Sequence, residues 1–376
     1  MKNNYRKLGD YIQPVDVRNS DLKVSHLLGL SIDKCFIESI ANTIGTDFRP
    51  YKIVKKGQFA YGPVTSRNGE KITIALLEEP ECIISSSYAV FEITDTSKLL
   101  PEYLMLWFSR PEFDRYARYK SHGSVREIFD WDEMCRVELP VPPLNEQQKI
   151  VDTYNAITNR IQIKQKINEN LEKTAQCLFE ELTKDKENFE AKTIEEISDA
   201  VICGKTPSTT ESKYWGNEIP FITIPDMHGS NFIHTTERYL SIAGKQSQEK
   251  QTLPKNSICV SCIATVGLVS LTTTESQTNQ QINSIICKEG ISFYYVFMLL
   301  KQMTDELKRL GAGGSTTLNI SKSLFASIKL EIPSNEQMNI FDKKVSSLFS
   351  KILINEKEIE KLEVLKKIVV SQISKR

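Results

Sequence analysis

The sequence has no long apolar run, no regular pattern of cysteines and no excess of charge of either sign. Among its 376 residues the longest nearly apolar segment is YYVFMLL at 294–300, far short of the roughly 18 residues of a membrane-spanning helix. Its eight cysteines are scattered, which indicates free thiols in a reducing compartment. The opening MKNNYRKLGDYI lacks the apolar core of a signal peptide. These absences favour a cytoplasmic protein without a membrane segment.

Catalytic and metal-binding patterns are also missing. GKT at 204–206 lacks the first glycine of a P-loop, because Asp199 stands in its place, and Pro207 follows where a helix would have to begin. Cys259 and Cys262 form a Cys-x-x-Cys without two further ligands at zinc-binding spacing, so a buried strand is the better interpretation. PVPPLN lacks the aromatic residue of an amino-methyltransferase motif. We expect no catalytic residue, metal site or cofactor in this chain.

The balance of charge limits one class of function. Lys and Arg together number 48, as do Asp and Glu, which argues against a free-standing, strongly basic nucleic-acid binder. A binder with local basic loops, or one whose partner supplies part of the cationic surface, stays open.

The chain contains a long internal repeat. PPLNEQQKI at 142–150 returns as IPSNEQMNI at 332–340, and mainly apolar residues then follow at steps of four and three. The first series is Ile150, Tyr154, Ile157, Ile161, Lys164, Asn168, Leu171, Ala175, Leu178 and Leu182, and adding 191 to each number gives the second. This spacing of 3.5 residues is the seam of a helix that packs along another helix. We expect the two helices to pack on each other, packing of each on its own domain being the alternative.

The repeat also reaches upstream of each helix. HGSVREIFDWDEMCRVELPVPP at 122–143 matches GGSTTLNISKSLFASIKLEIP at 313–333, and both end in an alternating, strand-like segment. Asn145 and Asn335 are the expected N-caps of the helices that follow. The order is therefore a domain at 1–143, a helix at 144–186, a second domain at 187–333 and a second helix at 334–376.

One stretch makes this order more specific. GKTPSTTESKYWGNEIPFITIPDM at 204–227, together with the two NEQ motifs and their helices, resembles the specificity subunit of a type I restriction–modification enzyme. The resemblance covers essentially the whole chain. The first half departs from it, since it has PVDVRNSDLKVSHLLGLSI at 14–32 in place of that opening.

The resemblance implies an α/β fold: two similar globular α/β target recognition domains separated by an antiparallel pair of long coiled-coil helices, with a pseudo-two-fold internal repeat. It implies that each domain reads one half of a split target in double-stranded DNA. The implied partners are methyltransferase subunits, usually two, which bind S-adenosylmethionine and methylate adenine, and a restriction subunit that can join them. The specificity subunit itself carries no catalytic residue.

Candidate DNA contacts lie on polar loops, because base edges and phosphates are recognised by Arg, Lys, Asn, Gln, Ser and Thr. In the first domain they are Arg67, Asn68, Lys71, Ser86, Ser87, Lys120 and Arg126. In the second domain they are Lys205, Thr206, Thr209, Lys213, Gln280, Gln281, Asn283, Ser315 and Thr316. The amides of Gln280, Gln281 and Asn283 suit adenine. For any one of these residues an ordinary polar surface loop is the alternative.

Two other functions stay open at this stage. A coiled-coil structural adaptor without a DNA role predicts polar loops that do not gather Lys and Arg in the folded chain. A stand-alone DNA-acting enzyme, such as a nuclease, requires carboxylates clustered in a cleft.

Overall fold

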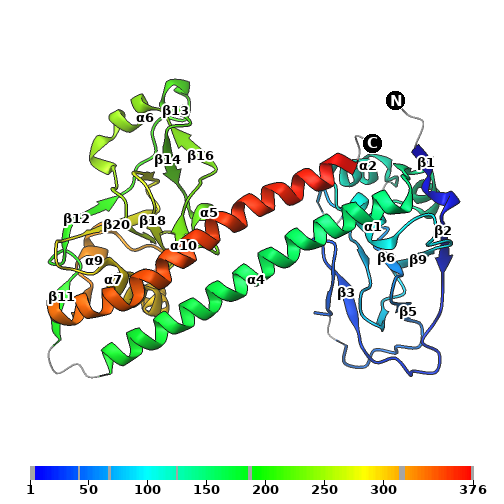
Figure 1. Cartoon of the computed structure of the whole chain (residues 1–376), viewed down its shortest axis with the longest axis horizontal. Coiled ribbons are helices and arrows are strands. Elements are labelled where there is room, and N and C mark those ends of the chain that lie inside the picture. The colour runs from blue at the N-terminus through cyan, green and yellow to red at the C-terminus, as the bar shows by residue number, and fades with distance from the viewer. Residues whose placement is uncertain are drawn as a thin grey trace. The chain divides into compact units, whose positions relative to one another are not determined.

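The computed structural model describes residues 5–40, 43–66, 69–123, 126–184, 189–312 and 318–373. Contacts within the chain divide it into two units, one of residues 1–161 with 362–376 and the other of residues 162–361. Two long helices, α4 (Leu144–Thr183) and α10 (Asn335–Gln372), are drawn in green and in orange to red in Figure 1. Each unit therefore contains one end of each helix.

The first unit is built on an antiparallel sheet of four strands in the order β2-β9-β6-β7. These strands are β2 (Ile12–Val15), β9 (Ala89–Ile93), β6 (Phe59–Tyr61) and β7 (Ile74–Leu76). Three two-stranded pairs accompany it: β1 (Tyr5–Lys7) with β10 (Glu138–Pro140), β3 (Leu28–Leu30) with β4 (Phe36–Glu38), and β5 (Lys52–Lys55) with β8 (Glu81–Ile84). The helices of this unit besides the long pair are α1 (Pro101–Phe108), α2 (Pro111–Lys120) and α3 (Trp131–Arg136).

Local sequence accounts for these helices. Pro101 and Pro111 occupy the first turns of α1 and α2, where the missing N–H costs nothing and the fixed φ suits a helix. Asp130 caps α3 by accepting a hydrogen bond from the Glu133 N–H at 2.8 Å. The core between helices and sheet is aromatic, with the rings of Phe59 and Phe91 stacked 4.9 Å apart.

The second unit has two sheets of four or more strands and, besides them, one two-stranded pair. The larger has the order β12-β20-β17-β18-β15, with β12 (Ser198–Cys203), β20 (Ile282–Cys287), β17 (Ile258–Ser261), β18 (Val269–Thr272) and β15 (Phe232–Ile233). The smaller has the order β13-β16-β14-β19, with β13 (Trp215–Gly216), β16 (Arg238–Leu240), β14 (Ile219–Ile222) and β19 (Gln277–Thr278). Its shorter helices are α5 (Ile224–Met227), α6 (Ile242–Ser247), α7 (Phe293–Gln302), α8 (Thr304–Gly311) and α9 (Lys322–Ala326).

The internal repeat is visible in the order of elements. The pair β1·β10 in the first unit corresponds to β11 (Glu190–Thr193) paired antiparallel with β21 (Lys329–Ile332) in the second. The helices α1, α2 and α3 of the first unit correspond to α7, α8 and α9 of the second, each set lying before the last strand and the long helix. The prediction of two similar α/β units joined to long helices is confirmed.

The two long helices pack on each other antiparallel within each unit. In the second unit Lys164 Nζ lies 2.7 Å from Glu358 Oε2, and the rings of Phe179 and Phe341 lie 6.1 Å apart. In the first unit Lys366 Nζ lies 5.1 Å from the centre of the Tyr154 ring. Residue numbers thus rise along one helix as they fall along the other.

The helices also belong to the cores of the units. Phe179 and Phe341 pack with other apolar residues of the second unit, including Tyr295 of α7. Val151 of α4 is buried in the core of the first unit, as is Ile373, which directly follows the end of α10. Both interpretations of the apolar seam are therefore correct: the helices pack on each other and also on the domains.

The predicted N-caps are wrong, because Asn145 and Asn335 already lie inside the helices. The cap of α10 is Ser334: its Oγ accepts from the Gln337 N–H at 3.3 Å, and Gln337 Oε1 accepts from the Ser334 N–H at 3.0 Å. This reciprocal pair is a capping box, which the sequence SNEQ contains and the prediction overlooked.

In the first unit the glutamine of the repeated motif has another role. Gln147 is fully buried; its Oε1 accepts from the Leu100 N–H at 2.9 Å, and its Nε2 donates to the Lys98 and Pro142 carbonyls at 2.8 Å each. One side chain thus fixes the start of α4 to the turn that leads into α1. No helix of the described ranges is long and apolar enough to cross a membrane.

Candidate nucleic-acid interface

In the second unit, two polar segments predicted to contact DNA meet at one end of the larger sheet. The β12–β20 ladder ends where Cys203 pairs with Asn283. Beyond it, Lys205 N–H donates to the Thr278 carbonyl at 2.9 Å, and Thr206 Oγ1 donates to Gln280 Oε1 at 2.7 Å. Segments some 70 residues apart in the sequence are therefore joined side by side.

Gly204 makes this close approach possible. A Cβ added there would lie 2.1 Å from the Asn279 carbonyl oxygen and 2.4 Å from that of Thr278. Both obstacles are backbone atoms, which cannot rotate away. The residue at this position must therefore be glycine for the two segments to lie as they do.

The segment 277–281 is held from beneath by Gln277, which is fully buried. Its Nε2 is within hydrogen-bond distance of the Lys245 carbonyl (3.1 Å), the Gln248 carbonyl (3.2 Å) and Thr252 Oγ1 (2.9 Å), and its Oε1 accepts from Gln248 Nε2 at 2.8 Å. Such a buried, satisfied network fixes the backbone that follows it.

The structure separates the predicted contacts of this unit by exposure. Lys205, Thr209, Lys213 and Gln280 are exposed, and Thr206 and Gln281 are partly so. Asn283 is different: it is only 2% exposed and its Nδ2 donates to the Ile320 carbonyl at 3.3 Å. Its side chain lies inside the sheet, so the prediction of a base contact there is not supported. Ser315 and Thr316 lie outside the described residues.

In the first unit, two of the predicted segments also lie together. The Thr65 N–H donates to the Glu127 carbonyl at 3.0 Å, and Thr65 Oγ1 donates to Ser121 Oγ at 2.9 Å. The segment at 64–66 therefore runs beside the segment that carries Lys120 and the exposed Arg126.

The other predicted contacts of this unit have their own surroundings. Lys71 is exposed, with its Nζ 3.4 Å from Asp33 Oδ1. Ser86 and Ser87 are exposed in the turn after β8, where Ser87 Oγ lies 3.0 Å from Ser85 Oγ. Arg67 and Asn68 lie outside the described residues.

Comparison with known proteins decides the family. The model of the Type I restriction modification DNA specificity domain matches residues 39–173 and 186–364. The chain belongs to the type I restriction–modification DNA specificity family. Each matched segment covers most of one α/β domain and most of the long helix that follows it, so the repeat seen in the fold is a repeat of this specificity domain.

Individual relatives agree with this assignment. The chain is 31% identical over 399 residues to the Type I restriction enzyme HindI specificity subunit of Haemophilus influenzae, with 86% of each protein covered. It is 30% identical over 187 residues to the MjaIX specificity subunit of Methanocaldococcus jannaschii, covering 49% of this chain and 42% of that protein. The solved S subunit of the type I restriction–modification system of M. genitalium has the same fold, with a TM-score of 0.64 at 14% identity over 98% of this chain and 95% of that one.

Family membership confirms the resemblance seen in the sequence and with it the function of the chain, recognition of a DNA target. The two specificity domains correspond to the two units. Their candidate DNA-contacting parts are the loops that carry Lys205 and Gln280 in the second unit, and the segments that carry Thr65 and Arg126 in the first.

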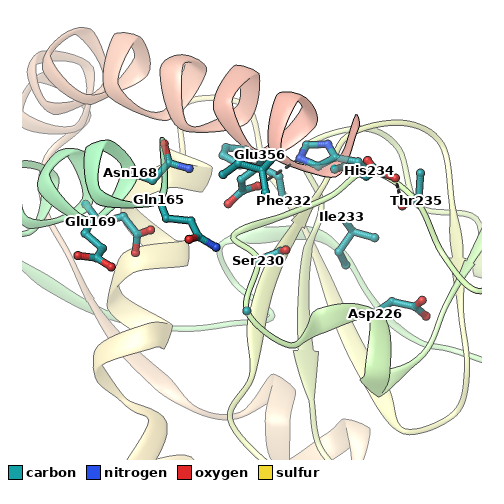
Figure 2. A pocket seen from close by; sticks show the side chains of 14 residues that line it. Gln165, Asn168, Glu169, Asp226, Ser230, Phe232, Ile233, His234, Thr235 and Glu356 are labelled. Atoms are coloured by element: carbon teal, nitrogen blue, oxygen red, sulfur yellow. Dashed lines mark hydrogen bonds and ion pairs between the residues drawn. The ribbon is translucent and has the colours of Figure 1, made fainter. Parts of the chain in front are cut away.

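The second unit also contains a cavity of about 660 Å³, which is acidic where the recognition loops carry lysine and amide side chains (Figure 2). Five carboxylates line it: Glu169, Glu172, Asp226, Glu356 and Glu360. Because carboxylates repel phosphates, we do not place DNA there. Among the described residues no group of His, Cys, Asp and Glu is arranged to hold a metal ion.

Three of these carboxylates, Glu172, Glu356 and Glu360, attach the larger sheet to the helix pair. The Asn231 N–H donates to Glu356 Oε1 at 3.2 Å and its Nδ2 donates to Glu172 Oε1 at 2.9 Å. His234 Nε2 lies 3.2 Å from Glu356 Oε2, and Thr235 Oγ1 donates to Glu360 Oε1 at 2.6 Å. The residues at the two ends of β15 are thus bonded to both α4 and α10, which gives these three carboxylates a structural role.

The sequence did not predict the contacts of two cationic side chains, Arg238 and Lys34. The Arg238 guanidinium lies 3.5 Å from the centre of the Trp215 ring, whose Nε1 donates to the Ser208 carbonyl at 3.2 Å and so fixes the loop after Gly204. In the first unit Lys34 Nζ forms a buried pair with Asp114 Oδ1 at 2.7 Å, and burial lowers the pKa of this lysine. Neither contact has a signal in the sequence, because each partner is distant along the chain.

The Cys-x-x-Cys is part of the core, as predicted. Cys259 lies within β17 and Cys262 directly follows it, and both are buried. Burial raises the pKa of the Cys259 thiol to about 12 and that of Cys262 to about 11. Both thiols are therefore protonated near neutral pH.

Proposed function

We propose that this chain reads a double-stranded DNA target made of two separated halves, one half for each unit. Recognition of DNA follows from the family; the division of the target is supported by two units that share their architecture and differ in their loops. The observation that carries the proposal is the meeting of Lys205, Thr206 and Gln280 on loops whose position Gly204 and Gln277 fix. These side chains offer a cation for phosphate and hydrogen-bonding groups for a base.

The same proposal assigns the chemistry to partners. Methyltransferase subunits, in two copies to match the two repeats, bind S-adenosylmethionine and methylate adenine, and a restriction subunit can join them. This chain contributes no catalytic group and positions the partners on the DNA.

The long helices are the proposed docking surface, and exposed apolar side chains support this. Ile163 and Ile167, one turn apart on α4, are 59% and 38% exposed. On α10 the exposed apolar side chains include Ile354 in the second unit and Val364, Leu365 and Ile368 in the first. When a partner helix covers exposed apolar groups at helical spacing, their removal from water favours binding. We further propose that the length of the helix pair sets the length of the unread spacer.

The test uses the chain purified with its methyltransferase partner and a library of random DNA. Selection should return two fixed short sequences separated by a spacer of constant length and variable sequence. Affinity should fall linearly with salt on a logarithmic scale, with a slope of about −0.9 for each phosphate contact. A selected pool without two fixed halves, or an affinity that does not change with salt, contradicts the proposal and favours an adaptor.

A further inference from the structure

The segment from Gln277 to Asn283 is rich in amides, and most of them are used inside the protein. Gln277 is bonded on all sides in the core, and Asn283 donates to the Ile320 carbonyl. Asn279 Nδ2 donates to Gln281 Oε1 at 3.0 Å, while Asn279 Oδ1 accepts from the Gln281 N–H at 3.1 Å. These four side chains hold the segment in shape.

Gln280 is the exception. It is exposed, and its Oε1 accepts a hydrogen bond from Thr206 Oγ1 at 2.7 Å. Within the described residues its Nε2 has no hydrogen-bond partner. An amide oxygen has two lone pairs, so Thr206 leaves one of them available.

We propose that Gln280 reads an adenine in the half-site of the second unit, and that Thr206 is a positioning residue that holds its amide for this contact. The inference rests on the proposed function and deepens it. Adenine presents N7 as an acceptor and N6–H as a donor in the major groove, and a glutamine amide matches both at once. The free Nε2 donates to N7, and the remaining lone pair of Oε1 accepts from N6.

The surroundings of Gln280 favour reading over chance exposure. A glutamine side chain on a free loop loses rotamer freedom when it binds, which weakens its contact with the base. Here Gly204 admits the close contact of the two loops, Gln277 fixes the backbone and Thr206 restrains the amide. Much of this ordering is complete before DNA arrives.

The test compares variants in the complex with the methyltransferase, using DNA selected from a random library. Gln280→Glu keeps the shape and replaces the donor N–H₂ with an acceptor oxygen. Adenine should be disfavoured by about fivefold to 150-fold at one position of one half-site, and cytosine, whose N4 donates, should gain there. The other half-site should not change.

A matched control is available on α6. Gln246 is an exposed amide of the same unit, and Gln246→Glu makes the same chemical change outside the recognition loops. It should leave the base preference at every position as in the wild type. Thr206→Val should relax the preference at the position that Gln280→Glu alters, and Thr206→Ser should restore it.

Several outcomes would overturn the inference. One is an unchanged preference in Gln280→Glu; another is a Thr206→Val variant that alters a different position. If Gln280→Glu abolishes binding while the protein stays folded by circular dichroism, Gln280→Ala decides: loss of preference at one position supports the proposal, and an unaltered preference refutes it. If the wild-type complex itself selects no split target, the proposed function fails instead.

Discussion

The most informative substitution for the fold is Asn355→Ala, in the middle of the helix seam. Asn355 is fully buried; its Oδ1 accepts from Lys164 Nζ at 3.1 Å and its Nδ2 donates to Asn168 Oδ1 at 2.7 Å. Alanine removes both bonds and leaves the buried oxygen of Asn168 without this donor. Lys164 keeps its ion pair with Glu358, so the perturbation is confined to the two asparagines and the lysine.

The expected cost follows from these contacts. A neutral hydrogen bond contributes about 1 kcal/mol and a charge-assisted one about 1.5–3 kcal/mol, while an unsatisfied buried acceptor costs about 1–3 kcal/mol. Because these terms overlap and alanine is a better helix former than asparagine by about 0.6 kcal/mol, we expect a net loss of about 2–4 kcal/mol. For a unit of about 200 residues, this lowers Tm by about 4–16 °C.

Scanning calorimetry of the whole chain is the assay, with Asn170→Ala as control. Asn170 is on the exposed face of α4, so its substitution should leave Tm unchanged or slightly higher. The double variant Asn168→Ala/Asn355→Ala should cost less than the sum of the single variants, since both remove the same bond. A Tm for Asn355→Ala equal to that of the control, or strict additivity, would refute the view that this polar group stabilises the seam.

Four further predictions follow from the same structure. Lys205→Met should weaken binding evenly across DNA sequences and reduce the salt slope by about 1, as measured by titration at several salt concentrations, whereas Lys255→Met should not. Gly204→Ala should displace the paired loops, so library selection should lose the half-site of the second unit and retain the other. Burial raises the pKa of Asp342 above its ordinary value of 3.8, so its carboxyl reduces stability as pH rises through the folded pKa; Asp342→Asn should raise Tm at pH 7 and leave it unchanged near pH 3. One heptad added at matched points of α4 and α10 should lengthen the selected spacer by about 3 base pairs, since seven residues add about 10 Å and a base pair about 3.4 Å.

The architecture was predictable because it depends on periodic patterns. The seam from Ile150 to Leu182 and the strand-like segments at 137–141 and 328–332 repeat in the same order, and such periodicity requires no knowledge of distant contacts. The caps were missed because SNEQ offers two residues that can begin a helix, and only the backbone geometry decides between Ser334 and Asn335.

The recognition loops were predictable in composition but not in geometry. Lys205 and Gln280 stood out as polar loop residues, yet nothing in the sequence places Thr206 beside Gln280. Asn283 has the same composition signal as its neighbours and is buried, because it still lies within β20 while Gln280 lies beyond its end. Lys34 and Asp114 illustrate the same limit, since a buried pair between a turn and a helix has no local signature.

The division of the chain has a consequence for the order in which it folds during synthesis. The core of the first unit includes Ile373, which is fully buried, and residues 362–373 leave the ribosome about 200 residues after Ile161. At a rate of synthesis of about 5–20 residues per second, the last apolar segment of the amino-terminal unit is made about 10–40 s after Ile161. Residues 162–361 are contiguous in the sequence, so the second unit can complete its fold first. The unit made first is therefore the last to be completed, and until then the apolar surface that Ile373 covers in the folded chain lacks this partner.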